Sequence, residues 1–226
     1  MSAVFIISAP SGSGKSTLVE KVRRIVSGID FSISYTTRQP RGNEKNGCEY
    51  SFVSREQFDG MVKRGEFLEH AEFDGNWYGT AKRFLDQAQQ NRHDLLLDID
   101  VQGAAQIKRK LPDAVSIFIL PPDRRTLEAR LRNRSLDKEE VIQRRLVTAS
   151  REIEKYREYD YILINDRLED SVEALKAILL AERQKRSGSI DATTLAIAER
   201  CRLSNVGERV QPILASFATA ATPGGR

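Results

Sequence analysis

Residues 4–17 read VFIISAPSGSGKST, and the architecture of the whole chain can be worked out from this stretch. An apolar β-branched run leads directly into a glycine-rich loop, and the following residues 18–26 place Leu18, Val22, Ile25 and Val26 on one helical face. A strand, a glycine loop and a helix in this order are typical of a phosphate-binding loop. Backbone N–H groups converge there on phosphate oxygens, and the helix amino terminus adds positive potential. We therefore expect a nucleotide-binding α/β protein.

The loop itself carries the residue types that nucleoside triphosphates require. Gly12 and Gly14 allow close backbone approach, Lys15 can reach the β- and γ-phosphates, and the Ser16 hydroxyl can bind Mg²⁺. One departure is that Ala9 stands where the pattern GxxxxGKS has its first glycine. GTPases and motor ATPases share such a loop, so it predicts a bound triphosphate but does not by itself predict a kinase.

Strand and helix patterns alternate along the rest of the chain. Apolar runs of strand type lie at residues 31–34, 94–100, 115–120 and 159–165, and helical patterns at 101–110, 123–132, 138–157 and 168–183. This alternation predicts a parallel sheet core flanked by helices, of the kind seen in P-loop NTPases.

Two carboxylates end the apolar run at residues 94–100. Asp98 and Asp100 are placed where a metal-side carboxylate is expected in a triphosphate site. The alternative is that they cap the strand end or form an ion pair.

Composition narrows the class of protein. The chain has 226 residues and a formal net charge of +4. This positive charge suits an enzyme that binds polyanionic nucleotides as well as a protein that binds nucleic acids. No basic tail is present, so we favour nucleotides and expect no nucleic-acid partner. Cys48 and Cys201 are far apart and are interpreted as reduced, non-ligating thiols, and His70 and His93 do not complete a zinc site with them.

The amino terminus bears on localisation. It has no basic region before its apolar run, and that run is too short for a signal peptide or a membrane span. We expect a cytoplasmic protein without a membrane partner.

Residues 34–80 interrupt the alternation and are interpreted as an inserted, small mixed α/β region over the carboxyl edge of the sheet. Arg38 and Arg41 suit a phosphate dianion, because paired guanidinium groups match its geometry. Tyr50 and Tyr78 can each donate a phenolic O–H to the same group.

Glu69 lies within a largely apolar run and has two possible roles. It is either exposed on a strand face or reads a base together with the hydroxyls of Ser34 and Thr80.

Several motifs in a fixed order resemble those of guanylate kinases of the bacterial type over about residues 3–186. They are SAPSGSGKST, SISYTTRQPR, EY with FV just after it, FLEHAEFDGNWYGT, LLLDIDVQGAAQI, SIFILPP, RLRNR and YDYILIND. The resemblance implies an ATP-dependent kinase that makes GDP from GMP, or from dGMP the deoxy product, with Mg²⁺ as cofactor. It also implies that the insertion is a GMP-binding region and that a helical lid lies near residues 133–146.

The resemblance further assigns roles to single residues. It implies that Lys15, Arg38, Arg134 and Arg145 are catalytic, that Arg134 and Arg145 belong to the lid, and that Ser16 and Asp98 lie on the metal side. The implied ATP contacts are Ala9, Pro10, Ser11, Gly12, Ser13, Gly14, Lys15, Ser16 and Thr17. The implied GMP contacts are Ser34, Arg38, Arg41, Tyr50, Glu69, Tyr78, Thr80 and Asp100.

The chain departs from the family pattern in two loops. The sequence RGNE at 41–44 replaces R-x-G-E, and Asn133 and Ser135 stand where glycines are frequent. Both departures bear on local backbone geometry and not on chemistry.

Two other functions are weighed against GMP kinase activity. A non-catalytic module of the same fold that binds phosphorylated peptides would not need Lys15, Ser16 or the lid arginines. A kinase for another small phosphate, such as a ribose bisphosphate, would not need Glu69 with hydroxyls at 34 and 80.

These patterns divide the chain into three parts. Residues 1–33 and 81–186 form the expected core, 34–80 the insertion, and 187–226 a C-terminal extension of small residues with one expected helix at 191–202. The extension carries no motif residue, so we expect kinase activity not to depend on it. Docking on the core is an open alternative, through Leu195, Ile197, Leu203 and Ile213.

Overall fold

The computed structural model of the protein describes residues 2–134, 138–189 and 191–218. The chain forms two compact units, unit 1 with residues 1–7 and 27–115 and unit 2 with residues 8–26 and 116–226. The predicted insertion falls within unit 1, and the predicted lid and extension fall within unit 2. No helix in the described part of the chain is long and apolar enough to cross a membrane.

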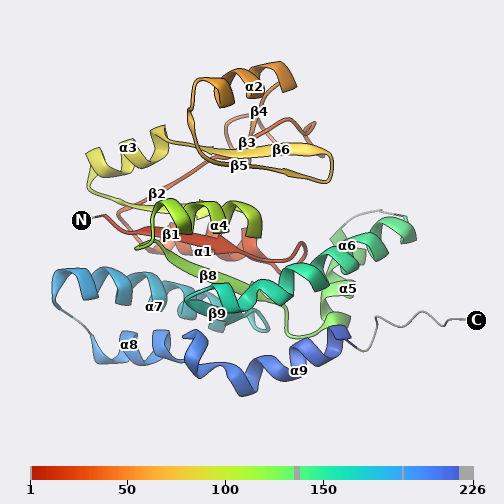
Figure 1. The fold of residues 1–226 in the computed structure, drawn as a ribbon. Coiled ribbons are helices and arrows are strands. Elements are labelled where there is room, and N and C mark those ends of the chain that lie inside the picture. Colours follow the sequence, from red (N-terminus) through yellow and green to blue (C-terminus); the bar gives the residue numbers. More distant parts are fainter. Residues whose placement is uncertain (1, 135–137, 190, 219–226) are drawn as a thin grey trace, which may run out of the picture. The chain divides into compact units, whose positions relative to one another are not determined.

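A five-stranded parallel sheet confirms the expected fold class, with the strand order β2-β7-β1-β8-β9 (Figure 1). Its strands are β1 (Val4–Ser8), β2 (Ile29–Phe31), β7 (Asp94–Asp98), β8 (Val115–Leu120) and β9 (Tyr161–Ile164). In unit 1, β7 pairs with β1 so that Asp98 lies opposite Ile7. In unit 2, β8 pairs with β9, and all six residues of β8 are buried, as its continuous apolar sequence predicts.

A second sheet of four strands lies in unit 1, in the order β4-β3-β6-β5. Its strands are β3 (Tyr35–Thr36), β4 (Ser51–Phe52), β5 (Phe67–Phe73) and β6 (Asn76–Ala81). Strands β5 and β6 are antiparallel and are joined by a turn in which Asp74 and Gly75 have φ of 51° and 71°. The β3–β4 pair, in contrast, is parallel.

The prediction of one strand over residues 31–34 is wrong, because this run is divided between the two sheets. The Ser32 N–H still bonds to the Leu96 carbonyl of the parallel sheet at 3.1 Å. Two residues later, the Ser34 carbonyl accepts the Ser51 N–H of the second sheet at 2.9 Å. The backbone therefore leaves one sheet and enters the other within three residues.

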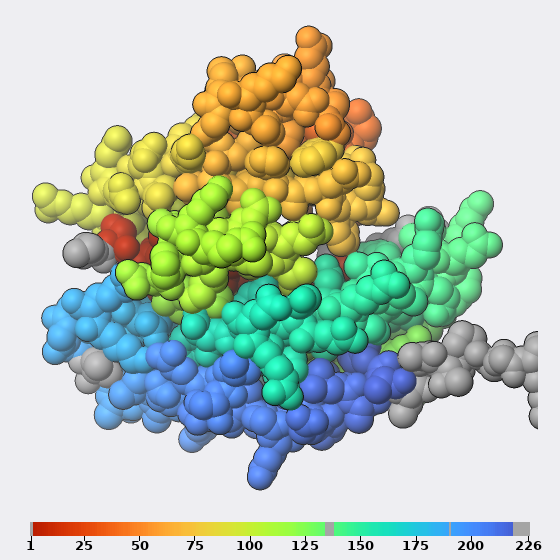
Figure 2. Space-filling model, in the orientation of Figure 1, coloured from red at the N-terminus to blue at the C-terminus, as the bar shows by residue number. Residues whose placement is uncertain are grey.

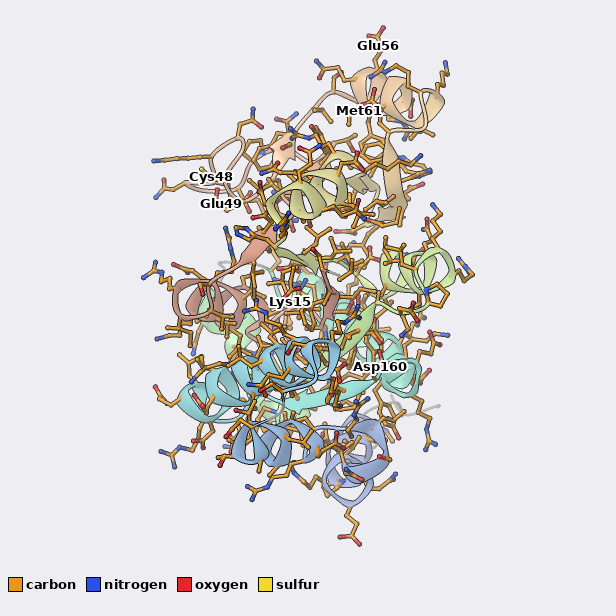
Figure 3. All side chains as sticks on the ribbon, turned by 90° about the vertical axis from the view of Figure 1, so that its left-hand side faces the viewer. Lys15, Cys48, Glu49, Glu56, Met61 and Asp160 are labelled. Carbon is orange, nitrogen blue, oxygen red and sulfur yellow. The ribbon has the colours of Figure 1, made fainter. Side chains whose placement is uncertain are left out.

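Three helices belong to unit 1: α2 (Arg55–Lys63), α3 (Arg83–Asn91) and α4 (Val101–Lys110). The first begins with a capping box, in which Ser54 Oγ accepts the Gln57 N–H at 3.1 Å and Gln57 Oε1 accepts the Ser54 N–H at 2.8 Å. The loop before β4 carries the exposed Cys48 beside Glu49 (Figure 3), whereas Cys201 is buried; both thiols are free.

The helices of unit 2 are α1 (Lys15–Ile25), α5 (Arg124–Arg134), α6 (Glu139–Ile153), α7 (Leu168–Ser187), α8 (Ala192–Glu199) and α9 (Gly207–Ala218). The sequence pattern predicts one helix over 138–157, but α6 ends at Ile153 and a 3-10 helix continues over Glu154–Glu158. The helix expected at 191–202 is shorter, and α9 is not predicted at all. Pro212 and many small residues make the apolar stripe of α9 hard to recognise in the sequence.

The C-terminal extension packs against the rest of unit 2. Residues 201–203 pair with β9, with the Ile162 N–H bonded to the Cys201 carbonyl at 2.7 Å and the Leu203 N–H to the Asp160 carbonyl at 3.1 Å. Helix α8 packs along α7 (Figure 2). Of the residues considered for docking, Ile213 is buried, while Leu195, Ile197 and Leu203 are half-buried. Among the described residues of the extension, the fully buried side chains are those of Ala198, Val206 and Val210.

Candidate active site

The phosphate loop of unit 2 depends on two glycines in the left-handed region. Gly12 has φ of 92° and Gly14 has φ of 87°. A Cβ at Gly14 would lie 2.3 Å from the side-chain nitrogen of Asn165, and one at Gly12 would lie 2.8 Å from Leu131. In the described part of the chain, the only residues other than glycine with positive φ are Asp74 and Arg92. Position 9 therefore does not need a glycine, which explains why Ala9 is tolerated.

Side chains from distant segments hold this loop in place. The Ser13 carbonyl accepts a hydrogen bond from Asn165 Nδ2 at 2.7 Å and one from the Arg130 guanidinium at 3.5 Å. Arg130 also donates to the Asn165 carbonyl at 3.0 Å, and Arg145 donates to Ser11 Oγ at 2.7 Å. Arg130 and Asn165 are missed as site residues by sequence reasoning, although both lie within motifs that carry the family resemblance.

The loop continues into α1, where the predicted triphosphate residues lie. Lys15 is the first residue of the helix and is half-buried (Figure 3), and Ser16 follows it with an exposed side chain. Thr17, the last of the predicted ATP contacts, is exposed.

The predicted lid lies at the junction of α5 and α6. Arg134 is the last residue of α5, and its side chain, like residue 135, lies outside the described part of the chain. Arg132 of α5 pairs with Glu139 at the start of α6 at 2.5 Å. The hydrogen bond from Arg132 holds the pKa of Glu139 at about 2, so this link persists at neutral pH.

Unit 1 brings together the residues predicted to bind a phosphate dianion. Arg38 is only 8% exposed, and its guanidinium lies 5.3 Å from the centroid of the Tyr50 ring. The Tyr50 and Tyr78 rings are 6.0 Å apart, and burial raises the pKa of Tyr50, which keeps its phenol protonated as a donor. Arg41 lies on the exposed loop that follows.

Glu44 joins this cluster and is missed by sequence reasoning. Its carboxylate accepts from the Arg38 guanidinium at 3.0 Å and from the Arg41 N–H at 2.8 Å. Gly42 has φ of 53°, whereas Asn43 is not in the left-handed region. The displaced glycine of the RGNE loop thus supplies the left-handed residue one position earlier, and the turn still delivers a carboxylate to Arg38.

A cluster of buried polar side chains, called the polar pocket here, lies on the paired strands β5 and β6. Glu69 of β5 is 4% exposed and lies opposite Thr80 of β6. Burial raises the pKa of Glu69 to about 7; the Asp100 charge adds to the shift, while Thr80 and Lys110 oppose it. Thr80 lowers the pKa of the Glu69 carboxylate, although its hydroxyl makes no aligned hydrogen bond that satisfies it within the described residues.

Two hydroxyls in this pocket are left without a partner. Ser34 Oγ and Thr80 Oγ1 are buried, and neither makes a hydrogen bond within the described residues. Buried hydroxyls without partners are costly, and a polar ligand could satisfy both. Glu69 is thus buried rather than exposed on a strand face, which removes the alternative considered from the sequence.

The amino end of α4 borders the same pocket. One oxygen of Asp100 accepts the N–H groups of Gln102 and Gly103, each at 2.8 Å, so Asp100 caps the helix. A Cβ at Gly103 would lie 2.6 Å from a carboxylate oxygen of Glu69. The missing side chain at Gly103 is therefore what makes room for that carboxylate.

Helix α4 is fastened along the edge strand β5 by three long side chains that sequence reasoning does not single out. Gln102 donates to the Glu72 carbonyl at 3.3 Å, Gln106 donates to the His70 carbonyl at 2.8 Å, and Lys110 donates to the Leu68 carbonyl. The spacing of four residues on the helix matches two residues on the strand, because four helical residues rise about 6 Å and two strand residues about 6.6 Å. This match fixes the distance between Asp100 and Glu69.

The donors available for a metal are hard oxygen atoms. Asp98 ends β7, and Ser16 presents a hydroxyl at the second position of α1. In the part of the chain that is described, no group of three or more His, Cys, Asp or Glu side chains could hold a metal ion. Mg²⁺ is commonly held by one or two protein oxygens together with substrate phosphates, and each of these two residues by itself offers an oxygen of that kind.

Comparisons with known proteins identify the family of the chain. The guanylate kinase family model matches residues 1–182, which end before the extension. The chain is 58% identical over 227 residues to a guanylate kinase of Koribacter versatilis, with 97% of each chain covered. It is 46% identical over 191 residues to a guanylate kinase of Geobacter metallireducens, which covers 84% of this chain and 94% of the relative.

A solved structure gives the same result. The crystal structure of guanylate kinase from Anaplasma phagocytophilum matches with a TM-score of 0.66 and 35% identity, covering 80% of this chain and 86% of that one. The chain therefore belongs to the guanylate kinase family.

Proposed function

We propose that this kinase transfers the γ-phosphoryl group of ATP to GMP, giving ADP and GDP. The observation that carries the proposal is the buried carboxylate of Glu69 beside two buried hydroxyls without partners, Ser34 and Thr80. Guanine presents N1–H and the N2 amino group side by side, and one carboxylate can accept from both. The hydroxyls can donate to O6, and Asp100 can accept a further N2 hydrogen.

Rejection of adenine follows from the same groups. Adenine has an unprotonated N1 where guanine has a donor, so its lone pair would face the lone pairs of Glu69. The pocket groups would then be buried and unpaired, and such losses give stronger selectivity than shape alone.

The phosphate end of GMP suits the Arg38 cluster. Arg38, Arg41, Tyr50 and Tyr78 supply positive charge and O–H donors for a dianion. Glu44 pairs with the Arg38 guanidinium. A bound phosphate would take the place of Glu44 or share that guanidinium with it. The proposed contacts involve only the base and the phosphate of GMP and not its ribose. We therefore extend the proposal to dGMP.

On the donor side, the proposed contacts to ATP are made by residues 9–17. Lys15, Arg38, Arg134 and Arg145 are the cations that neutralise charge as the phosphoryl group moves, and no side chain forms a covalent intermediate. Mg²⁺, held by Ser16 and Asp98, would neutralise charge on the β- and γ-phosphates.

A panel of acceptors tests this assignment. Full-length protein with ATP and Mg²⁺ is given GMP, dGMP, AMP or a ribose bisphosphate, and release of ADP is followed together with formation of the phosphorylated product. We expect rapid turnover with GMP and dGMP and little with the others. Preference for a ribose bisphosphate, or binding of phosphopeptides without any turnover, would contradict the proposal.

A further inference from the structure

We infer that the C-terminal extension is a positioning element for the phosphate loop, acting through α5 and α6 and not by contact with a nucleotide. The family model ends before this segment, and the sequence motifs give it no role. The inference rests on the proposed function only in that ATP is taken as the ligand of the loop. All the contacts that support it lie within unit 2.

The first contact joins the extension to the start of α5. Ser216 of α9 accepts the N–H of Arg124, the first residue of α5, at 3.0 Å, and donates its own proton to the Ile213 carbonyl at 2.6 Å. The first amides of a helix have no partner within the helix. Asp123 already caps the Thr126 N–H at 2.6 Å, so Ser216 and Asp123 together fix where α5 begins.

The second contact joins α5 to the phosphate loop. Leu127 and Leu131 lie under Gly12, since a Cβ there would come within 3.1 Å of the first and 2.8 Å of the second. Arg130, on the same helix, donates to the carbonyls of Ser13 and Asn165. A shift of α5 along its axis would therefore be felt directly at the loop, because well-packed side chains transmit displacement.

The third contact reaches α6. Helix α9 packs against both α5 and α6, and its buried stripe consists of Val210, Ile213 and Phe217. Arg145 of α6 donates to Ser11 Oγ at 2.7 Å. The extension thus supports both helices from which arginines contact the backbone or side chains of residues 11–13.

The extension is itself firmly anchored, as a positioning element must be. Arg202 lies 4.4 Å from the centroid of the Tyr161 ring and bonds to Glu182 at 2.8 Å. Lys185 and the Tyr161 hydroxyl donate to the same carboxylate. Glu182 is mostly buried, so this network is less screened by solvent than a surface ion pair.

The experiment compares full-length wild type with Ser216→Ala, Ser216→Thr and Phe217→Leu. Ser204→Ala is the matched control, since Ser204 is an exposed serine of the same extension that bonds only locally to Asn205 among the described contacts. Calorimetry without GMP gives the Kd for ATP with Mg²⁺, and steady-state assays give kcat and both KM values. Thermal unfolding reports on stability.

We expect Ser216→Ala to weaken ATP binding about 2- to 10-fold, the range of one hydrogen bond, with the KM for GMP unchanged. Ser216→Thr should restore ATP binding, Phe217→Leu should weaken it, and Ser204→Ala should match wild type. If Ser216→Ala and Phe217→Leu lower only the Tm and leave the Kd for ATP as in wild type, the extension has a structural role alone and the inference is wrong. Absence of turnover with GMP would contradict the proposed function. The Kd for ATP of the variants would still show whether the extension positions the phosphate loop.

Discussion

The phosphate loop and the proposed base pocket present their groups to a ligand in opposite ways. The loop offers backbone groups and cations from one continuous segment, and Asn165, Arg130 and Arg145 fix its shape from outside. The pocket offers side chains from separate segments, among them a carboxylate that burial keeps near the middle of its titration at neutral pH.

This difference has an energetic meaning. In the loop, Ser13 Oγ is buried without a partner among the described residues. Lys15, Ser16 and Thr17 are half-buried or exposed, so the loop costs the fold less than the pocket does. The pocket holds a desolvated carboxylate and two hydroxyls without partners, which destabilise the ligand-free protein. Changes to the exposed or half-buried side chains next to the loop, such as Lys15, should therefore lower the rate without changing stability. Changes in the pocket should alter selectivity and stability together.

The largest effect is expected for Lys15→Met. The variant should lose about 10³-fold or more in kcat, because the lysine neutralises charge that develops between the phosphates. Its Tm should stay near that of wild type, since Lys15 lies at a helix start and not in the core. Turnover near the wild-type level would show that Lys15 and its loop take no part in phosphoryl transfer.

Arg145→Ala should lower kcat by about 10²–10³-fold while leaving the KM for GMP nearly unchanged, as expected for a group that acts in the transition state. Arg144→Ala is the matched control, because Arg144 is the exposed neighbour on the same helix. A change confined to the KM for GMP would show that Arg145 is misassigned to the donor side.

Glu69→Gln should lower kcat/KM for GMP about 10- to 150-fold, since hydrogen bonds to a charged group are worth about 1.5–3 kcal/mol. Use of AMP should fall less, or rise. Glu72→Gln, at an exposed position of the same strand, is the control and should change neither value. Equal losses for GMP and AMP would mean that Glu69 supports the fold and does not read the base.

A smaller effect concerns stability and pH. The folded-state pKa of Glu69 is raised, so the protonated form favours folding, and this contribution is lost as pH rises from 4.5 through about 7. Relative to Glu69→Gln, which cannot titrate there, ligand-free wild type should lose about 2–3 kcal/mol of unfolding free energy between pH 4.5 and pH 8. Denaturant unfolding at both pH values measures this difference. A difference that does not vary with pH would show that the carboxylate is well solvated.

The contiguous features of the molecule are the ones that sequence predicts well. The glycine-rich loop and the helix that follows it are contiguous in the sequence, so local geometry determines them. Helix α9 is missed because Pro212 is a strong helix breaker in the sequence, although Val210, Ile213 and Phe217 have helical spacing.

The supporting contacts of both sites are harder to predict. Gln102 and Gln106 have recognisable helical spacing, but their partners are backbone carbonyls of β5, which have no signature in sequence. Asn165 supports the phosphate loop across 152 positions of the chain. Only the folded topology brings such groups together.

The pairing of residues 201–203 with β9 also has a consequence for how the chain is made. The last strand of the parallel sheet is complete at Ile164, and its outer edge stays open until Leu203 has been synthesised. An uncovered strand edge is a template for pairing with other chains. Nascent or prematurely ended chains that stop after α7 would carry this open edge on an otherwise finished sheet. They would be the forms of this protein that self-associate and that chaperones must recognise.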